Sequence, residues 1–160
     1  MWDASIPTKW ETHGVLADVL LFMAQSVNHP IAQLPGLTPV QLKQLEDCGI
    51  LTTFDLLRQG NSVAQRQQLS KRLNTNIKHI NKWAALANLA RIPGVGCDYC
   101  GLLLHAGVST PQQLSVMNVQ RLHPQLLRLQ IQLFNRADLA PDTAQVVGWI
   151  QQAQQLVRRN

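Results

Sequence analysis

Acidic residues are scarce in this chain, and their scarcity excludes one class of enzyme site. The sequence holds nine Asp and Glu among 160 residues, and six of them fall in the first sixty positions. A two-metal centre needs several carboxylates close together, so we expect none here. The five histidines are scattered, and no Ser/His/Asp set or Gly-Lys-Ser/Thr phosphate loop occurs. The sequence therefore predicts a protein that is not an enzyme and that carries no cofactor.

Cysteine and long apolar runs are also in short supply. Three cysteines are an odd number, which argues against a disulfide scaffold. The longest apolar stretch, Val15–Met23, contains Asp18 and is far shorter than the roughly 20 residues of a membrane span. No positively charged leader precedes it. We therefore expect a soluble, cytoplasmic protein.

Charge is sparse and unevenly placed. Charged residues make up 14% of the chain, against roughly 25% in typical soluble domains. The net charge of +5 is concentrated in residues 61–91, which contain no acidic residue and six basic ones: Arg66, Lys71, Arg72, Lys78, Lys82 and Arg91. Such a stretch is a candidate contact region for an anionic partner such as nucleic acid. The alternative is an ordinary solvated helix face.

One pattern occurs twice in the chain. Residues 34–57 read LPGLTPVQLKQLEDCGILTTFDLL, and residues 92–115 read IPGVGCDYCGLLLHAGVSTPQQLS. An offset of 58 aligns the two Pro-Gly pairs and also Gly49 with Gly107. Further along, Trp83 and Trp149 align at an offset of 66, each followed four positions later by alanine. The sequence thus predicts an internal duplication, with the two tryptophans at equivalent core positions.

The apolar spacing predicts helices and no strands. Apolar residues recur at helical spacing, and no alternating apolar and polar run is present. Pro39 suits a first helical turn, Gly36 suits a turn with a positive φ, and Gly49 suits a helix C-terminus. Beyond the two short helices of each repeat, helices are expected over Gly14–Val27, Val63–Leu73, Ile77–Ala90, Leu122–Phe134 and Thr143–Val157.

These features resemble a known motif and a known family. A Pro-Gly turn followed by a helix that ends in Gly-Ile or Gly-Val resembles the helix-hairpin-helix motif. The second repeat, with GCDYCG at 96–101, Arg121-Leu122 and Trp149-Ile150, is similar to the family called domain of unknown function 4332, especially its cyanobacterial members. The resemblance covers roughly residues 31–157. It implies an all-α fold of two pseudo-symmetric helix-hairpin-helix units packed as one compact body. The chain would then divide into three segments: an N-terminal tail and helix (1–30), the first unit (31–91) and the second unit (92–160).

The resemblance also implies where phosphate would bind. In helix-hairpin-helix proteins, the Gly-hydrophobic-Gly turn leaves backbone N–H groups free at a helix N-terminus, and these contact a DNA phosphate without reading sequence. By this resemblance the better phosphate cradle consists of Gly94, Val95, Gly96 and Cys97, and the poorer one of Gly36, Leu37 and Thr38.

Two positions depart from the DNA-binding pattern. Such hairpins usually carry Lys or Arg just after the turn, whereas this chain has Asp98 and Val40 there. The positive charge would then have to come from Arg66, Lys71, Arg72, Lys78 and Lys82, and binding would weaken steeply with salt. The alternative is that both hairpins only connect helices.

Cys97 and Cys100 form a CxxC pair at a predicted helix N-terminus. The positive end of the helix would lower a thiol pKa there, as in redox motifs, although the sequence lacks the α/β setting of such motifs. The pair also supplies two of the four ligands of a structural zinc site, with Cys48 and His105 as weak further candidates. The third possibility is that these are structural thiols.

Two functions of different classes remain open. The first is sequence-independent binding of the DNA or RNA backbone through the Gly94–Cys97 turn and the basic residues of 66–91. The second is a protein–protein interaction adaptor or scaffold, which would dock a partner through weakly charged, glutamine-rich helical faces and the Val15–Met23 helix. Only the first predicts strong dependence on salt.

Overall fold

The computed structural model describes residues 26–159, and within them the chain is all-α, as predicted. The predicted helix over Gly14–Val27 therefore lies almost entirely outside the described residues. The described elements are η1 (Ile31–Gln33), α2 (Pro39–Asp47), α3 (Thr53–Gln59), α4 (Val63–Leu73), α5 (Ile77–Ala90), α6 (Gly96–His105), α7 (Pro111–Ser115), α8 (Val119–Phe134), η2 (Ala137–Leu139) and α9 (Thr143–Arg159). The predicted bounds of α4 and α5 are confirmed.

Side-chain caps explain where most of these helices begin. Thr52 and Ser62 accept the first free N–H groups of α3 and α4, and Thr110 and Asn118 do the same for α7 and α8. A capping side chain satisfies N–H groups that have no partner inside the helix. The cap at Asn118 also corrects the prediction that α8 begins at Leu122, because Pro124 is accommodated within the helix.

Residues with positive φ mark where several helices end. Gly49 and Gly107 follow α2 and α6 with φ of 81° and 87°. Asn74 and Asn135 end α4 and α8 in the same left-handed region. These are the two residue types that adopt this conformation at least cost. The same order of stops and caps thus occurs in residues 49–74 and again in 107–135, whereas α6 begins without the side-chain cap that Thr38 gives α2.

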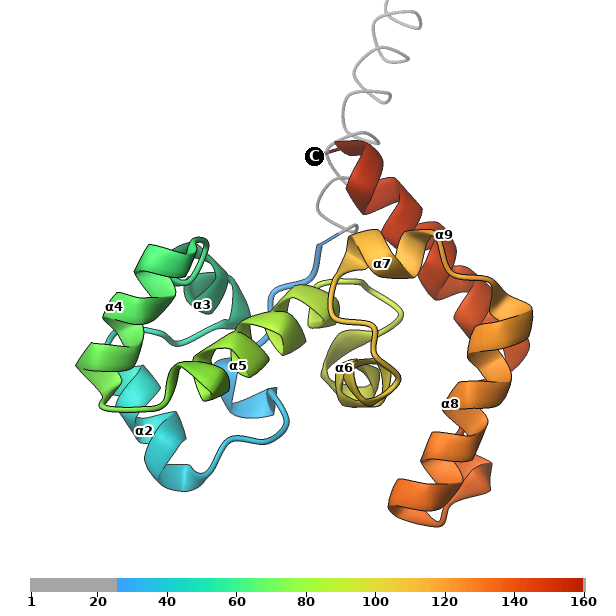
Figure 1. The fold of residues 1–160 in the computed structure, drawn as a ribbon, viewed down its shortest axis with the longest axis horizontal. Helices are drawn as coiled ribbons and strands as arrows, with labels where there is room; N and C mark the ends of the chain where they lie inside the picture. Colours follow the sequence, from blue (N-terminus) through green and yellow to red (C-terminus); the bar gives the residue numbers. More distant parts are fainter. Residues whose placement is uncertain (1–25, 160) are drawn as a thin grey trace, which may run out of the picture.

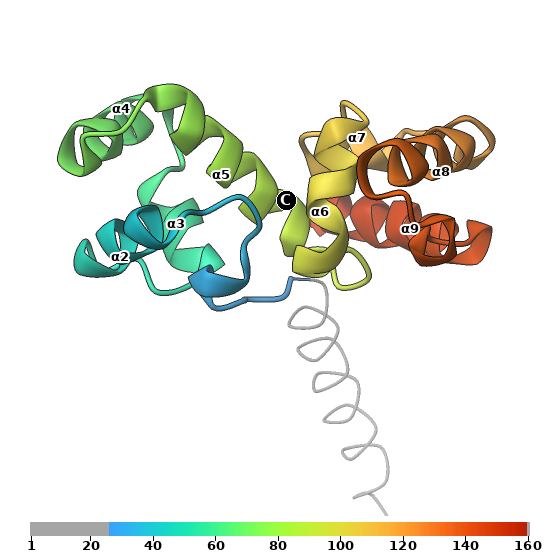
Figure 2. The ribbon, with the colours of Figure 1, turned by 90° about the horizontal axis from the view of Figure 1, so that it is seen from below.

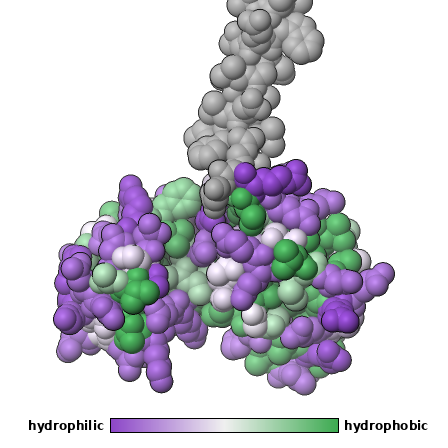
Figure 3. Space-filling view, turned by 45° about the horizontal axis from the view of Figure 1, so that its top comes forward, coloured by the Kyte–Doolittle hydropathy of each residue, from purple (hydrophilic) through white to green (hydrophobic). Residues whose placement is uncertain are grey.

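The helices are arranged in two halves that lie side by side. Figures 1 and 2 show α2–α5 on one side and α6–α9 on the other, with α5 leading from the first half toward α6. Helix α5 packs on α6, and α7 packs on α9. In Figure 3, hydrophilic side chains cover most of the visible face of the half that holds α2–α5.

One apolar core runs through both halves. Its buried side chains extend from Ile31 to Leu156 without a break into separate clusters. Trp83 on α5 and Trp149 on α9 are both fully buried in it, as predicted. The segment before η1 is tied to the end of α5, because Val27 donates its N–H to the Arg91 carbonyl at 2.8 Å. None of the described helices is both long and apolar enough to cross a membrane.

Candidate nucleic-acid interface

The first turn offers free backbone donors beside a lysine. Gly36 has a φ of 83°, and neither its N–H nor that of Leu37 has an acceptor among the described residues. Thr38 is used differently. Its hydroxyl accepts the Gln41 N–H, and its own N–H donates to the Gln41 side chain at 3.0 Å. The Lys82 Nζ lies 3.6 Å from where a Cβ on Gly36 would stand. Two N–H groups and an ammonium group therefore meet at this turn.

The second turn is largely occupied by the protein itself. The Gly94 N–H donates to the Gln152 Oε1 at 2.8 Å, and those of Val95 and Gly96 donate to the Ile92 carbonyl. A Cβ on Gly94 would lie 2.7 Å from Trp149, so α9 covers this residue closely. In the described structure only the Cys97 N–H of the predicted set is free, and the carboxylate of Asp98 follows it. These contacts favour the first turn over the second as a phosphate cradle.

The remaining predicted basic residues lie on α4 and α5. Lys71 and Arg72 end α4, whereas Lys78 and Lys82 lie one turn apart on α5, and all four are exposed. We call these four residues the basic surface. The ion pairs found in residues 26–159 are Arg58–Asp55 and Arg136–Asp138, so no carboxylate there pairs with the basic surface. Its positive charge is free to meet an anion.

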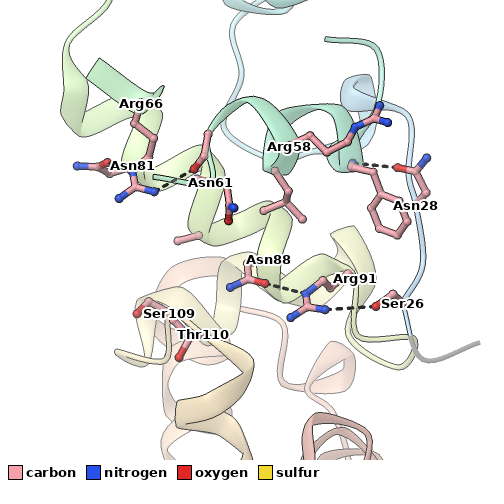
Figure 4. A pocket seen from close by; sticks show the side chains of 15 residues that line it. Ser26, Asn28, Arg58, Asn61, Arg66, Asn81, Asn88, Arg91, Ser109 and Thr110 are labelled. Atoms are coloured by element: carbon pink, nitrogen blue, oxygen red, sulfur yellow. Dashed lines mark hydrogen bonds between the residues drawn. The ribbon is translucent and has the colours of Figure 1, made fainter. Parts of the chain in front are cut away.

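A polar cavity lies along α5, and we call it the arginine cleft. It has a volume of about 800 Å³ and is formed by the segment before η1, α3, the start of α4, α5 and the loop before α7. Its polar lining consists of Arg58, Arg66 and Arg91, the asparagines 28, 61, 81 and 88, and the hydroxyls of Ser26, Ser109 and Thr110. Figure 4 shows Arg58 and Arg66 on one side of the cleft and Asn88 and Arg91 along α5. None of the described lining residues is acidic.

Neutral oxygens hold two of these arginines in place. The Arg66 Nε donates to the Asn81 Oδ1 at 2.9 Å, and its Nη1 donates to the Gly60 carbonyl at 2.9 Å. The Arg91 Nε donates to the Asn88 Oδ1 at 2.7 Å. Arg91 is half-buried, and this burial lowers the pKa of its guanidinium group. The cleft can therefore bind an anion, but it has no carboxylate, imidazole or thiol for acid–base or nucleophilic chemistry among its described lining residues.

Sequence reasoning found only Arg66 among the arginines assigned here to the cleft. Arg91 was counted in the basic stretch but was not selected as a site residue, and Arg58 was overlooked. A usable signal was present on α5, where Asn81, Asn88 and Arg91 share one face at helical spacing. The contributions of Ser26 and Thr110 carry no such signal, because they reach the cleft from distant parts of the chain.

The cysteine pair does not have the expected thiol chemistry. Burial raises the pKa of Cys97, with Asp98 adding to the effect. Burial also raises the pKa of Cys100 to about 12, which corrects the prediction of a lowered thiol pKa. Desolvation of the thiolate outweighs the helix end. The described residues contain no group of three or more His, Cys, Asp or Glu placed to hold a metal ion.

A second cavity of about 790 Å³ lies between the Pro35-Gly36 turn, α5, α6, the end of α8 and η2, so Gly36 and Lys82 of the first turn also line it. It is more apolar than the arginine cleft, because Leu86, Leu102, Leu104, Tyr99, Phe134 and Leu139 all line it. Phe134 and Leu139 are about half exposed, at 56% and 50%. This apolar groove is a surface on which a protein partner could pack.

Comparison with known proteins gives a family but no relative of known activity. The family model for a domain of unknown function (DUF4332) matches residues 35–156, which covers both repeats. No curated protein and no solved structure matches the chain.

Proposed function

This chain belongs to the DUF4332 family of domains of unknown function, and we propose that it is a non-enzymatic module that binds the backbone of nucleic acids without reading their sequence. The observation that carries this proposal is the basic surface, Lys71, Arg72, Lys78 and Lys82, which is exposed and has no carboxylate partner in the described structure. Phosphate neutralisation by such residues supplies most of the affinity of non-specific binding.

The first turn supports the same function. The N–H groups of Gly36 and Leu37, which find no acceptor in the described part of the chain, lie beside Lys82, one residue of the basic surface. Backbone N–H groups next to a cation suit a phosphate oxygen, because both donate to it and neither distinguishes one base from another. The first turn and α5 would thus bind successive phosphates of one nucleic-acid strand.

Binding of labelled DNA and RNA at two salt concentrations tests the proposal. We expect micromolar affinity at about 50 mM salt and a loss of about 100-fold at about 200 mM, because four or five neutralised phosphates give that slope. The triple variant Lys71→Glu, Arg72→Glu and Lys78→Glu should abolish binding. The matched control reverses Lys43, Arg121 and Arg128, three exposed basic residues on other helices, and should bind better than the first variant. Equal loss in both variants would show that only net charge matters, and no binding at low salt would refute the proposal.

The apolar groove favours a second candidate function, that of a protein-interaction adaptor. Phe134 and Leu139 are exposed apolar residues beside it, and exposed apolar patches mark interaction surfaces. A Phe134→Ser and Leu139→Ser variant would lose partner binding but keep nucleic-acid binding. If nucleic acid does not bind and this variant abolishes a purified partner interaction, the adaptor function is the correct one.

A further inference from the structure

We propose that the arginine cleft holds one unpaired nucleotide of a single strand, with its two flanking phosphates on the guanidinium groups of Arg66 and Arg91 and its base against the apolar wall. This inference rests on the proposed function and narrows it. The basic surface attracts any nucleic acid, whereas the cleft discriminates between an unpaired strand and a duplex.

Two cations of the cleft, anchored about two turns apart on α5 at Asn81 and Asn88, can each bind one phosphate. Arg66 and Arg91 are each oriented by hydrogen bonds to neutral oxygens. In the described structure the Nη2 group of each has no protein acceptor. A guanidinium group fixed in this way presents a planar pair of donors that matches phosphate oxygens. Both arginines therefore retain donors for a ligand.

The position of Arg91 strengthens this assignment. Its side chain is half-buried, and no described carboxylate compensates its charge. A cation withdrawn from water with only neutral partners carries a desolvation cost, which a bound anion would offset. The cleft thus favours a negatively charged group at this end.

An apolar wall faces the same space. Phe54 and Leu57 come from α3, and Ala84 and Ala85 come from α5. The small alanine side chains on α5 leave room in the cleft. The aromatic ring of Phe54 provides a surface on which any base can stack. Such stacking tolerates every sequence, which agrees with binding that does not read bases.

Asparagine amide groups also line the cleft. The Oδ1 atoms of Asn28, Asn81 and Asn88 already accept hydrogen bonds, from the Phe54 N–H and from Arg66 and Arg91. Within residues 26–159 no acceptor takes these amide NH₂ groups, so each can donate to acceptor atoms on a base edge or on a phosphate.

The size of the cleft decides between a single strand and a duplex. Its volume of about 800 Å³ falls in the range of about 300–1,000 Å³ that is typical of small-molecule sites. A duplex keeps its bases stacked inside, so it can offer phosphates to the basic surface but no base face to the cleft. Unpaired nucleotides can turn their bases outward onto protein side chains.

The test compares binding of a labelled 15-nucleotide DNA strand and of its duplex by fluorescence anisotropy at about 50 mM salt. The wild type should bind the single strand about 10-fold more tightly, and Phe54→Ala should remove most of this preference. Arg66→Lys keeps the charge but not the planar fork, and should weaken single-strand binding about 5-fold. Arg128→Lys makes the same change on an exposed part of α8 and should have no effect.

The outcomes separate the two proposals. Equal affinity for strand and duplex, with Arg66→Lys no different from Arg128→Lys, would overturn the cleft assignment and leave backbone binding by the basic surface intact. If the wild type binds neither the single strand nor the duplex, both the cleft assignment and the proposed backbone binding are wrong. Circular dichroism checks that Phe54→Ala is folded, and if it is not, the comparison of Arg66→Lys with Arg128→Lys decides alone.

Discussion

At the scale of single residues, backbone conformation and burial determine what each side chain contributes. Gly107 follows α6 with a φ of 87° and has open space where a Cβ would stand. Gly148 also has open space around it, but it lies within α9 without a positive φ. Substituting these two glycines therefore tests the effect of backbone conformation alone, because neither new side chain would clash with a neighbour.

Alanine at these two glycines should have opposite effects. Gly107→Ala should lower the free energy of unfolding by about 1 kcal/mol, because an L-residue is strained at that φ. Gly148→Ala should raise it by about 0.5–1 kcal/mol, since alanine favours a helix interior. Urea denaturation monitored by circular dichroism measures both values. Destabilisation by Gly148→Ala of the size seen for Gly107→Ala would contradict the argument from φ.

The CxxC thiols should be unreactive in the folded protein. Burial raises the pKa of Cys97 and raises that of Cys100 to about 12. A raised pKa leaves less thiolate at a given pH, so Cys100 should react at pH 8 about 1,000-fold more slowly than an ordinary thiol. A Cys48→Ser variant isolates the pair, and a chromogenic disulfide reagent counts its thiols. Slow reaction in the native state and two thiols after denaturation are expected, whereas fast native reaction would revive the redox hypothesis.

At the scale of elements, the turn before α6 is held by a helix that follows it much later in the chain. Gln152 and Trp149 on α9 close over Gly94, and one of them accepts its N–H. The turn is thus part of the packing of α9 within the second half. This arrangement explains why a turn with a suitable sequence does not present the expected set of donors.

Substitutions at this contact should affect stability before they affect binding. Gly94→Ala would place a Cβ 2.7 Å from Trp149 and should cost about 1–3 kcal/mol, because α9 must shift. The corresponding glycine of the first repeat, Gly36, has only the end of the flexible Lys82 side chain nearby. Thermal unfolding measures the change in stability of Gly94→Ala, and the anisotropy assay measures its nucleic-acid binding. Loss of binding by Gly94→Ala at unchanged stability would restore the second turn as the phosphate cradle.

At the scale of the whole molecule, the two halves share one core. The buried apolar residues form a single cluster that includes Trp83 and Trp149. Helix α5 lies at the centre of this arrangement, with the arginine cleft on one side and the apolar groove on the other. Both candidate binding sites therefore depend on how the halves pack.

Truncating either tryptophan should destabilise the entire molecule. Trp83→Ala and Trp149→Ala should each cost about 3–5 kcal/mol, because both indoles are fully buried. Since the core is continuous, helix content and the fluorescence signal of the other buried tryptophan should change in one transition. Two separated transitions would show that the halves unfold independently.

Much of the fold was predictable from the sequence because its signals are local. Apolar spacing identified α4 and α5 at their observed bounds, and the same spacing placed Trp83 and Trp149 in the core. The start of α8 was missed, since the helix was predicted from Leu122 and the cap at Asn118 places its start upstream. Local signals do not report which distant residue approaches a turn.

By itself, the sequence determined the all-α class, the positions of most helices and the basic stretch of 61–91, because spacing, caps and charge are properties of neighbouring residues. Only the tertiary structure decided which backbone donors are occupied, which thiols are buried and which residues form the cleft. It placed Gln152 on the Gly94 N–H, 58 positions away, and Lys82 beside Gly36. It also buried Cys100 and joined segments from Ser26 to Thr110 around the arginine cleft. Donor availability, desolvation and concavity depend on long-range packing, which no local pattern specifies.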